Sequence, residues 1–378
     1  MRYAIHAAAA TALAALAATP AAAEQRLLHE AIELQGVALY FSSGVPALVL
    51  GVVKDGETAV IGFGEIADGS GKEPDGDTMM RIGSITKVFT GTTFASLVAD
   101  GTVGLADPLE QHLGWGPVPG RDGHAIRLIE LATHTSGLPR EADREQGTAS
   151  DPFKTLTEET YRKDLATDPL VFTPGTGGLY SNFAFDLLGI ALGNAAGKPF
   201  TTLQEERAIA PAGLKDTVFT LRPGDEDRLM QGHFLDGSPM PTIPTTPVMA
   251  GASSLYSTPN DILKWLAWHM DRFSDKDADT RVVDHAAYVF RDQISPVLGF
   301  DESGEMDAMG LGWVVMAATD SSPLMLQKAG GLQGVFSYAA FAPATGVGAF
   351  VAINKFDFAT ATQMATVVNR IVADLSPR

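Results

Sequence analysis

Two residues near the start of the chain, Ser84 and Lys87, have the types and spacing needed for nucleophilic catalysis. The segment 84–99 carries apolar residues at helical spacing, which places a serine and a lysine three positions apart one turn apart on one face. A cation in the first turn opposes the helix dipole, which lowers the lysine pKa and favours the neutral amine that a general base needs. The alternative is that Ser84 caps the helix and Lys87 is a solvated charge, although a capping box would place Glu or Gln at position 87.

A second candidate is the segment Tyr180-Ser181-Asn182, between a Gly- and Pro-rich turn at 174–178 and a predicted helix that begins near Phe183. In a catalytic interpretation, Tyr180 relays a proton to a leaving group and the Asn182 amide holds a substrate carbonyl. The structural alternative is also open. Asn is among the best helix N-caps, and Tyr180 can be a half-buried aromatic residue whose hydroxyl is satisfied.

The third candidate is Lys328-Ala329-Gly330-Gly331, at the end of a predicted strand. Adjacent glycines allow close backbone approach, and their N–H groups can stabilise a developing oxyanion. The Lys-x-Gly pattern is common, and a second instance that begins at Lys54 is explained as a turn.

The elements expected around these candidates are β-rich at both ends of the chain and helical between them. A hairpin is predicted from runs 47–54 and 58–64, joined by a three-residue link at 55–57. Helices are predicted at 25–35, 84–99, 127–133, 183–196, 203–210, 260–270 and 359–375, and late strands at 311–317, 324–328, 334–341 and 347–354. The pattern predicts an α+β fold, with an antiparallel sheet built from both chain ends, terminal helices covering it and an inserted, mostly helical lobe. Residues 24–106 and 285–378 are assigned to the sheet lobe and 107–284 to the helical lobe, with the site between them.

The composition and the N-terminus restrict the setting. A formal net charge of −18 and a pI near 4.7 argue against nucleic acid as a partner. Arg2, the apolar run Ala7–Ala18 and the small residues Ala21–Ala23 form the pattern of a secretory signal peptide, with cleavage expected after Ala23. The apolar run is too short to span a bilayer, so no transmembrane segment is expected. The chain has no Cys, which fits a soluble periplasmic or secreted protein without disulfides.

Other chemistries have little support. The histidines show no H-E-x-x-H or comparable metal-ligand spacing, and there is no Walker loop, GxGxxG unit or G-x-S-x-G elbow. No metal or organic cofactor is therefore expected. A His-based triad stays open, because triad partners need not be near in sequence. The histidines considered are His29, His112, His124, His134, His233, His269 and His285.

The order of the three candidates resembles the serine β-lactamase and penicillin-binding protein superfamily, in its class C-like branch, where class A would have Ser-Asp-Asn at the second motif. The segment 131–139, Leu-Ala-Thr-His-Thr-Ser-Gly-Leu-Pro, is similar to a signature of this branch. Four segments resemble D-alanyl-D-alanine carboxypeptidase/endopeptidases within it, namely Ala132–Glu141, Tyr180–Thr220, Ser254–Trp265 and Gly310–Pro343. The likeness extends over most of the chain that follows the expected signal peptide.

The resemblance implies that Ser84 is the nucleophile, Lys87 its base and Tyr180 the proton shuttle. It further implies that Asn182 and Lys328 position substrate, that the N–H groups of Ser84 and Gly331 form the oxyanion hole, and that His134 is structural. The implied activity is serine-type D-alanyl-D-alanine carboxypeptidase/endopeptidase action on peptidoglycan peptides, and the same residues fit a class C-like β-lactamase, a carboxylesterase of the same fold or a non-catalytic penicillin sensor. One departure is Ala329, where the family usually has Thr. The oligomeric state is not specified by these patterns.

Overall fold

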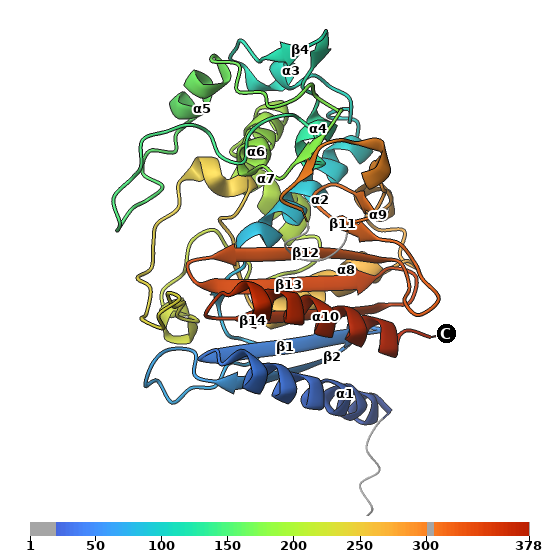
Figure 1. Cartoon of the computed structure of the whole chain (residues 1–378). Helices are drawn as coiled ribbons and strands as arrows, with labels where there is room; N and C mark the ends of the chain where they lie inside the picture. The colour runs from blue at the N-terminus through green and yellow to red at the C-terminus, as the bar shows by residue number, and fades with distance from the viewer. Residues whose placement is uncertain (1–19, 301–305, 378) are drawn as a thin grey trace, which may run out of the picture.

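The computed structural model describes residues 20–300 and 306–377, and its centre is an eight-stranded antiparallel sheet. The strand order is β2-β1-β14-β13-β12-β11-β10-β8, so β1, from the N-terminal part of the chain, pairs along its length with β14, from the C-terminal part (Figure 1). This confirms the prediction of an antiparallel sheet built from both chain ends. The strands of the sheet are β1 (Ala47–Lys54), β2 (Glu57–Gly64), β8 (Val289–Phe290), β10 (Ala308–Met309), β11 (Val314–Met316), β12 (Met325–Leu332), β13 (Val335–Ala342) and β14 (Val347–Ile353).

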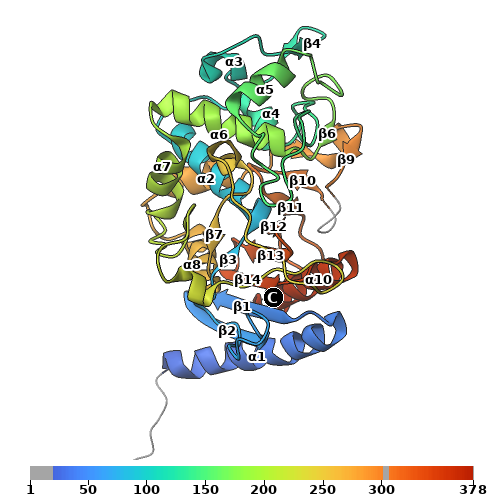
Figure 2. The same cartoon turned by 90° about the vertical axis from the view of Figure 1, so that its left-hand side faces the viewer.

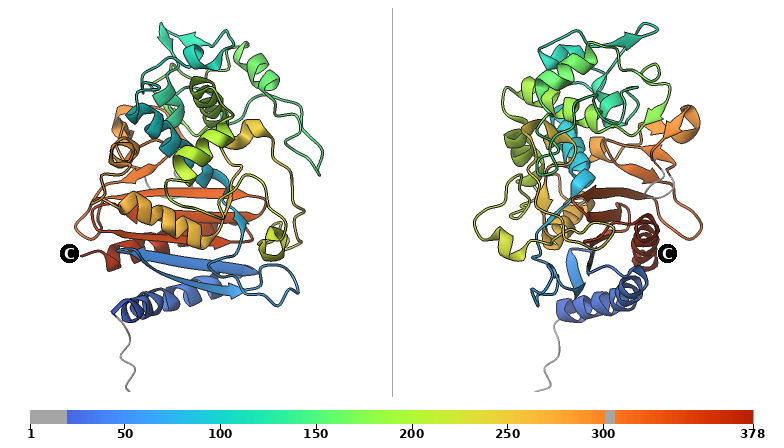
Figure 3. Two further views of the ribbon diagram at one scale, coloured as in Figure 1. Left: turned by 180° about the vertical axis from the view of Figure 1, so that it is seen from behind. Right: turned by 60° about the vertical axis from the view of Figure 1, so that its left-hand side comes forward.

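Helices cover both faces of this sheet. The terminal helices α1 (Pro20–Ser43) and α10 (Phe358–Leu375) lie side by side on one face, and α8 (Pro259–Met270) lies on the other (Figure 1 and Figure 3). Strand β1 has no polar side chain from Ala47 to Val53 because both of its faces are covered. Leu48 and Leu50 pack in the cluster under α1 and α10, whereas Val49 and Val53 pack in the cluster with α8. Successive strand residues point to opposite faces, so in a sheet covered on both sides residues of either orientation are buried.

The remaining helices lie above the β12 end of the sheet, with α8 lower on one side (Figure 2). Helix α6 (Asn182–Ala196) is at its centre and packs against α2 (Thr86–Ala99), α3 (Leu109–Leu113), α4 (Leu128–Ala132) and α7 (Phe200–Gln204). Two further helices are α5 (Glu158–Leu165) and α9 (Ala278–Asp284), and short strand pairs are β3 (Met80–Arg81) with β7 (Tyr256–Ser257), β4 (Gly120–Arg121) with β5 (His124–Ala125), and β6 (Gly178–Leu179) with β9 (Val297–Leu298). The division into lobes stays a prediction. Helix α8, which falls within the range 107–284 assigned to the helical lobe, packs on the sheet.

Several local details differ from the sequence prediction. Lys54 pairs with Glu57, so the hairpin turn has two residues, Asp55 and Gly56, and both have positive φ as a type I′ turn requires. Helix α1 runs from Pro20 to Ser43 and is longer than the predicted helix 25–35. The predicted helix 203–210 is divided between α7 and a π-helical turn, Glu205–Ile209. Late strand β12 extends to Leu332, four residues beyond the predicted end.

The structure describes only part of the segment predicted to be a signal peptide. The predicted n-region and the apolar run 7–18 lie outside the described residues, and the small residues 21–23 lie in the first turn of α1. Within the part of the chain that is described, no helix combines the length and apolar character needed to cross a membrane.

Candidate active site

The local structure at Ser84 and Lys87 excludes the capping interpretation. Residues Gly83–Ile85 form a 3-10 turn, α2 starts at Thr86, and the N-cap position, Ile85, makes no side-chain capping bond. Ser84 is partly exposed, whereas Lys87 is completely buried and is not a solvated charge. The two side chains meet as the spacing predicts, with Lys87 Nζ 3.2 Å from Ser84 Oγ.

The surroundings of Lys87 match a neutral amine. Burial lowers its pKa well below the ordinary value, and the positive charge of Lys328 lowers it further. A neutral amine has two N–H donors and one lone pair. Two acceptors contact Nζ, the Asn182 Oδ1 at 2.6 Å and the Ala252 carbonyl oxygen at 3.0 Å. With both donors used, the lone pair is left for the Ser84 hydroxyl, which is the arrangement of a general base and its nucleophile.

Tyr180 and Asn182 are held where β6 leads into α6. Ser181 is the N-cap of α6, and its Oγ accepts a hydrogen bond from the Ala184 N–H at 2.9 Å. Asn182 is therefore the first helical residue and not the cap, which corrects the structural alternative for this position. Since Ser181 supplies the cap, the Asn182 amide is available to bond Lys87.

The buried side chain of His134 contacts the segment Tyr180-Ser181-Asn182. Its Nδ1 accepts a hydrogen bond from the Ser181 N–H at 3.0 Å, and its ring stacks on that of Tyr180 with 4.4 Å between centroids. Burial lowers the pKa of His134 well below the ordinary value, so the ring is neutral. The imidazole orients the Tyr180 ring, in agreement with the structural interpretation of this histidine.

Lys328 and the glycine pair bring the C-terminal part of the chain to the same place. Lys328 Nζ lies 3.3 Å from the Tyr180 hydroxyl. A Cβ added at Gly330 would lie 2.0 Å from the Ile82 carbonyl oxygen and 3.0 Å from the Ser84 nitrogen, so only glycine permits β12 to run this close to the nucleophile. Gly83, with φ of +51°, faces the backbone of Gly331 in the same way.

A cavity of about 400 Å³ opens beside these groups. Ser84, Tyr180 and Lys328 line it together with the glycine pair, and apolar side chains form much of the remaining wall. Its volume is within the range of pockets that bind small ligands. The structure therefore brings together the predicted residues Ser84, Lys87, Tyr180, Asn182, Lys328, Gly330 and Gly331.

Two carboxyl groups near the site were missed by sequence reasoning. Glu141 Oε1 accepts a hydrogen bond from the Asn182 amide at 2.5 Å. Asp186, one helical turn after Asn182, is buried, and its Oδ2 accepts a hydrogen bond from the Tyr161 hydroxyl at 2.5 Å. Burial raises the pKa of Asp186 to about 8. A lone acid inside the apolar segment 183–192 was the signal that could have identified Asp186.

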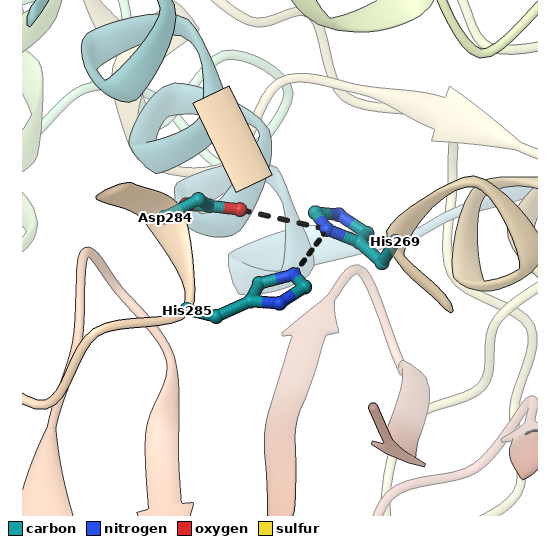
Figure 4. Close-up of side chains that lie close together, drawn as sticks. All are labelled: His269, Asp284 and His285. Carbon is teal, nitrogen blue, oxygen red and sulfur yellow. Dashed lines mark hydrogen bonds and ion pairs between the residues drawn. The ribbon is translucent and has the colours of Figure 1, made fainter. Parts of the chain in front are cut away.

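Of the histidines, only His134 contacts the site residues among those described. His269 and His285, separated by 16 residues, meet in the interior beside Asp284 (Figure 4). The sequence predicts scattered histidines, because spacing within one motif does not detect side chains that tertiary packing brings together from distant segments.

Comparisons with known proteins agree with this geometry. The family model described as Beta-lactamase matches residues 18–373. The D-alanyl-D-alanine-carboxypeptidase/endopeptidase AmpH of Escherichia coli (strain K12) is 37% identical over 342 residues, which is 89% of this chain and 87% of that protein. A β-lactamase of Pseudomonas fluorescens is 24% identical over 82% of this chain and 89% of its own.

Solved structures show the same relationship. The β-lactamase/D-alanine carboxypeptidase of Yersinia pestis, complexed with citrate, superposes with a TM-score of 0.81 at 32% identity, over 93% of this chain and 99% of that chain. A class C β-lactamase has the same fold, with a TM-score of 0.76 at 17% identity over 94% of this chain and 98% of its own. The matched length, the fold and the sequence identity show that the chain belongs to the β-lactamase family, whose members include serine β-lactamases and D-alanine carboxypeptidases.

Proposed function

We propose that the chain is an exported serine hydrolase that acts on peptidoglycan as a D-alanyl-D-alanine carboxypeptidase/endopeptidase through an acyl-enzyme on Ser84. The observation that carries the proposal is the buried Lys87 amine, whose two acceptors leave its lone pair for the Ser84 hydroxyl. The extensive similarity to AmpH supports the substrate class.

In the acylation step, the Ser84 proton passes to Lys87 Nζ while Oγ bonds to the carbonyl carbon of a D-Ala peptide bond. The negative charge that develops on the carbonyl oxygen is stabilised by the N–H groups of Ser84 and Gly331, and such preorganised donors are usually the largest electrostatic contribution. The C–N bond then breaks, and the leaving amine takes up the proton that Lys87 received, relayed through the Tyr180 hydroxyl, which Lys328 contacts. Water attacks the ester, releases the acyl group and restores the Ser84 hydroxyl.

Ala329 lines the cavity and bears on which substrates are preferred. The family usually has Thr at this position. A threonine hydroxyl there commonly helps to bind the free carboxylate of a terminal D-Ala or a β-lactam. Loss of one charge-assisted hydrogen bond costs about 1.5–3 kcal/mol, or roughly 10- to 150-fold in affinity. We therefore expect internal cross-links and esters to be handled better than substrates that rely on a free carboxylate. The variant Ala329→Thr should raise carboxypeptidase turnover, and no gain would reject this explanation.

The decisive experiment incubates purified protein and its Ser84→Ala variant with cross-linked muropeptides and follows products by mass spectrometry. Both samples are also tested for a penicilloyl adduct. Cleavage at D-Ala bonds that disappears in Ser84→Ala supports the peptidase. Retained turnover in that variant would reject Ser84 as the nucleophile. An adduct without peptide cleavage would instead favour a β-lactamase, an esterase or, where no steady-state turnover follows, a penicillin sensor.

Export is part of the same proposal and has a separate test. The N-terminal residue of the protein recovered from the periplasm or medium should be Glu24, after cleavage behind Ala23. Recovery of the intact N-terminus from the cytoplasm would contradict it.

A further inference from the structure

A cluster of three potential metal ligands lies inside the protein, outside the candidate active site. His269 is in the last turn of α8, Asp284 is the last residue of α9, and His285 follows it directly. Figure 4 shows the three side chains converging on one point. His269 and Asp284 are inaccessible to solvent, whereas His285 is partly exposed and gives the cluster its contact with solvent.

The three groups are close enough to contact a single ion. His269 Nδ1 is 2.9 Å from His285 Nε2 and 3.6 Å from Asp284 Oδ2, and one ligand atom from each residue lies within 4.8 Å of the others. In a tetrahedral zinc site with bonds of about 2.0–2.1 Å, neighbouring ligand atoms are separated by roughly 3.3 Å. The two measured distances lie on either side of that value. Two imidazoles and one carboxylate are also a donor set that suits zinc and other first-row divalent metals.

The surrounding groups resemble a second shell. Asp284 Oδ2 accepts hydrogen bonds from Thr92 Oγ1 at 3.0 Å and from Trp313 Nε1 at 3.3 Å, and such partners orient a ligating carboxylate. The rings of Trp265, Trp313 and Phe341 pack around His269. These contacts limit the movement of the imidazole and keep water from the interior side of the cluster.

Hydrogen bonding within the cluster leaves two buried polar atoms without a protein partner. They are the second carboxylate oxygen of Asp284, Oδ1, which an ion at the cluster can contact, and the Nε2 of His269, which lies across the ring from the converging Nδ1 and is not satisfied by an ion bound there. An unpartnered buried polar atom costs free energy, so such an atom in a native structure requires an explanation. We propose that His269, Asp284 and His285 bind a divalent first-row transition metal ion, with zinc as the natural candidate. The ion gives the buried carboxylate an opposite charge and joins α8 to α9.

One positive charge opposes the ion. The buried guanidinium of Arg281 lies on α9, one turn before His285. Its positive charge repels a cation bound at the cluster. We therefore infer a structural site of moderate affinity. Because neither histidine belongs to the candidate active site, the ion takes no part in the proposed acyl transfer.

The test uses the full chain after removal of metals with a chelator. Co²⁺ is added as a zinc substitute, because its visible absorption reports tetrahedral nitrogen and oxygen ligation, and bound metal is measured by mass spectrometry after gel filtration. We expect about one equivalent bound, with a rise in Tm on addition of Zn²⁺. His285→Ala should lower the affinity about 100-fold or more, since even loss of an outer-shell partner costs about 10- to 100-fold. His124→Ala, at an exposed position on β5, is the matched control and should bind normally.

Asp284→Asn provides a second variant, because its amide oxygen can still accept the bonds from Thr92 and Trp313 while the charge is removed. It should fold, as judged by circular dichroism, and bind Co²⁺ much more weakly. If Asp284→Asn fails to fold, the partly exposed His285 still tests the site. Failure of the metal-free wild type to take up about one equivalent would overturn the proposal. So would equal uptake by wild type and His285→Ala, which would indicate an adventitious ion elsewhere.

Discussion

Asp186 is the buried acid beside the candidate general base, and replacing it with Asn should change how stability depends on pH. Its Oδ2 accepts the Tyr161 hydroxyl at 2.5 Å, and burial raises its pKa from 3.8 to about 8. In the unfolded chain the carboxyl releases its proton near pH 3.9. The folded protein keeps that proton until about pH 8 and therefore binds more protons than the unfolded chain over this window.

The sign and size of the effect follow from proton linkage. The free energy of unfolding falls by about 1.36 kcal/mol for each pH unit between the two pKa values. Between pH 5 and pH 7 the Asp186 carboxyl thus removes about 2.7 kcal/mol of stability. Asn has the same shape, cannot ionise and keeps an oxygen that accepts from Tyr161. Asp186→Asn should therefore gain about 2.7 kcal/mol relative to wild type when the pH is raised from 5 to 7.

The assay is equilibrium urea unfolding of wild type and Asp186→Asn at pH 5, 6 and 7. The relevant quantity is the difference between the two proteins at each pH, because the titration of Asp284, whose pKa burial raises to about 7, is common to both. Asp236→Asn is the control. The hydrogen bonds from Ser238 lower the pKa of this exposed carboxyl. The difference in free energy of unfolding between wild type and Asp236→Asn should therefore not change with pH above pH 5. A flat difference for Asp186→Asn as well would refute the assignment of a protonated Asp186.

Three further variants test the geometry of the site. Lys87→Ala should slow penicillin acylation by about 10²- to 10⁴-fold, the usual contribution of a general base, and an unchanged labelling rate would exclude Lys87 from that role. Gly330→Ala places a Cβ against the Ile82 carbonyl and should lower the penicillin labelling rate about 100-fold. In Gly331→Ala the added Cβ meets mainly the Phe336 ring, at 3.1 Å, so the labelling rate should fall only a few-fold. Similar labelling rates for the two variants would contradict the close approach of β12 to the nucleophile. Glu141→Gln keeps an acceptor for the Asn182 amide but removes the charge, so kcat/KM on a muropeptide should fall about fivefold, and an unchanged value would remove Glu141 from substrate positioning.

The fold was predictable where hydrophobic pattern and turn chemistry agree. The apolar runs of β1, β13 and β14 coincide with the predicted strands to within one or two residues, because a sheet covered on both faces leaves continuous apolar segments. The start of α8 was also predictable, since Thr258 before Pro259 is a strong helix start and caps the helix in the structure. The extension of β12 to Leu332 was not. Two glycines argue against a strand, and only the neighbouring backbone of 82–84 explains them.

The site was predictable residue by residue only where a motif kept the partners close in sequence. Ser84 and Lys87 share one turn, so their contact follows from helix geometry alone. The contacts of Lys87 with Asn182 and Ala252 join residues about a hundred or more positions apart, and no local pattern encodes them. The same limit applies to His269 and His285, whose helices come together only through tertiary packing.

The lowered pKa of Lys87 has a cause that depends on the folded structure. From the sequence, the helix dipole is the expected cause of the lowered pKa, whereas in the folded protein burial comes first and the charge of Lys328 second. Ionised carboxylates at Asp186 and Glu141 would act in the opposite direction and favour the charged amine. The burial that neutralises Lys87 also raises the pKa of Asp186, so at neutral pH Asp186 holds its own proton and does not draw one onto the base. A buried acid beside a general base is thus compatible with catalysis, because one desolvated environment keeps both groups neutral until the Ser84 proton arrives.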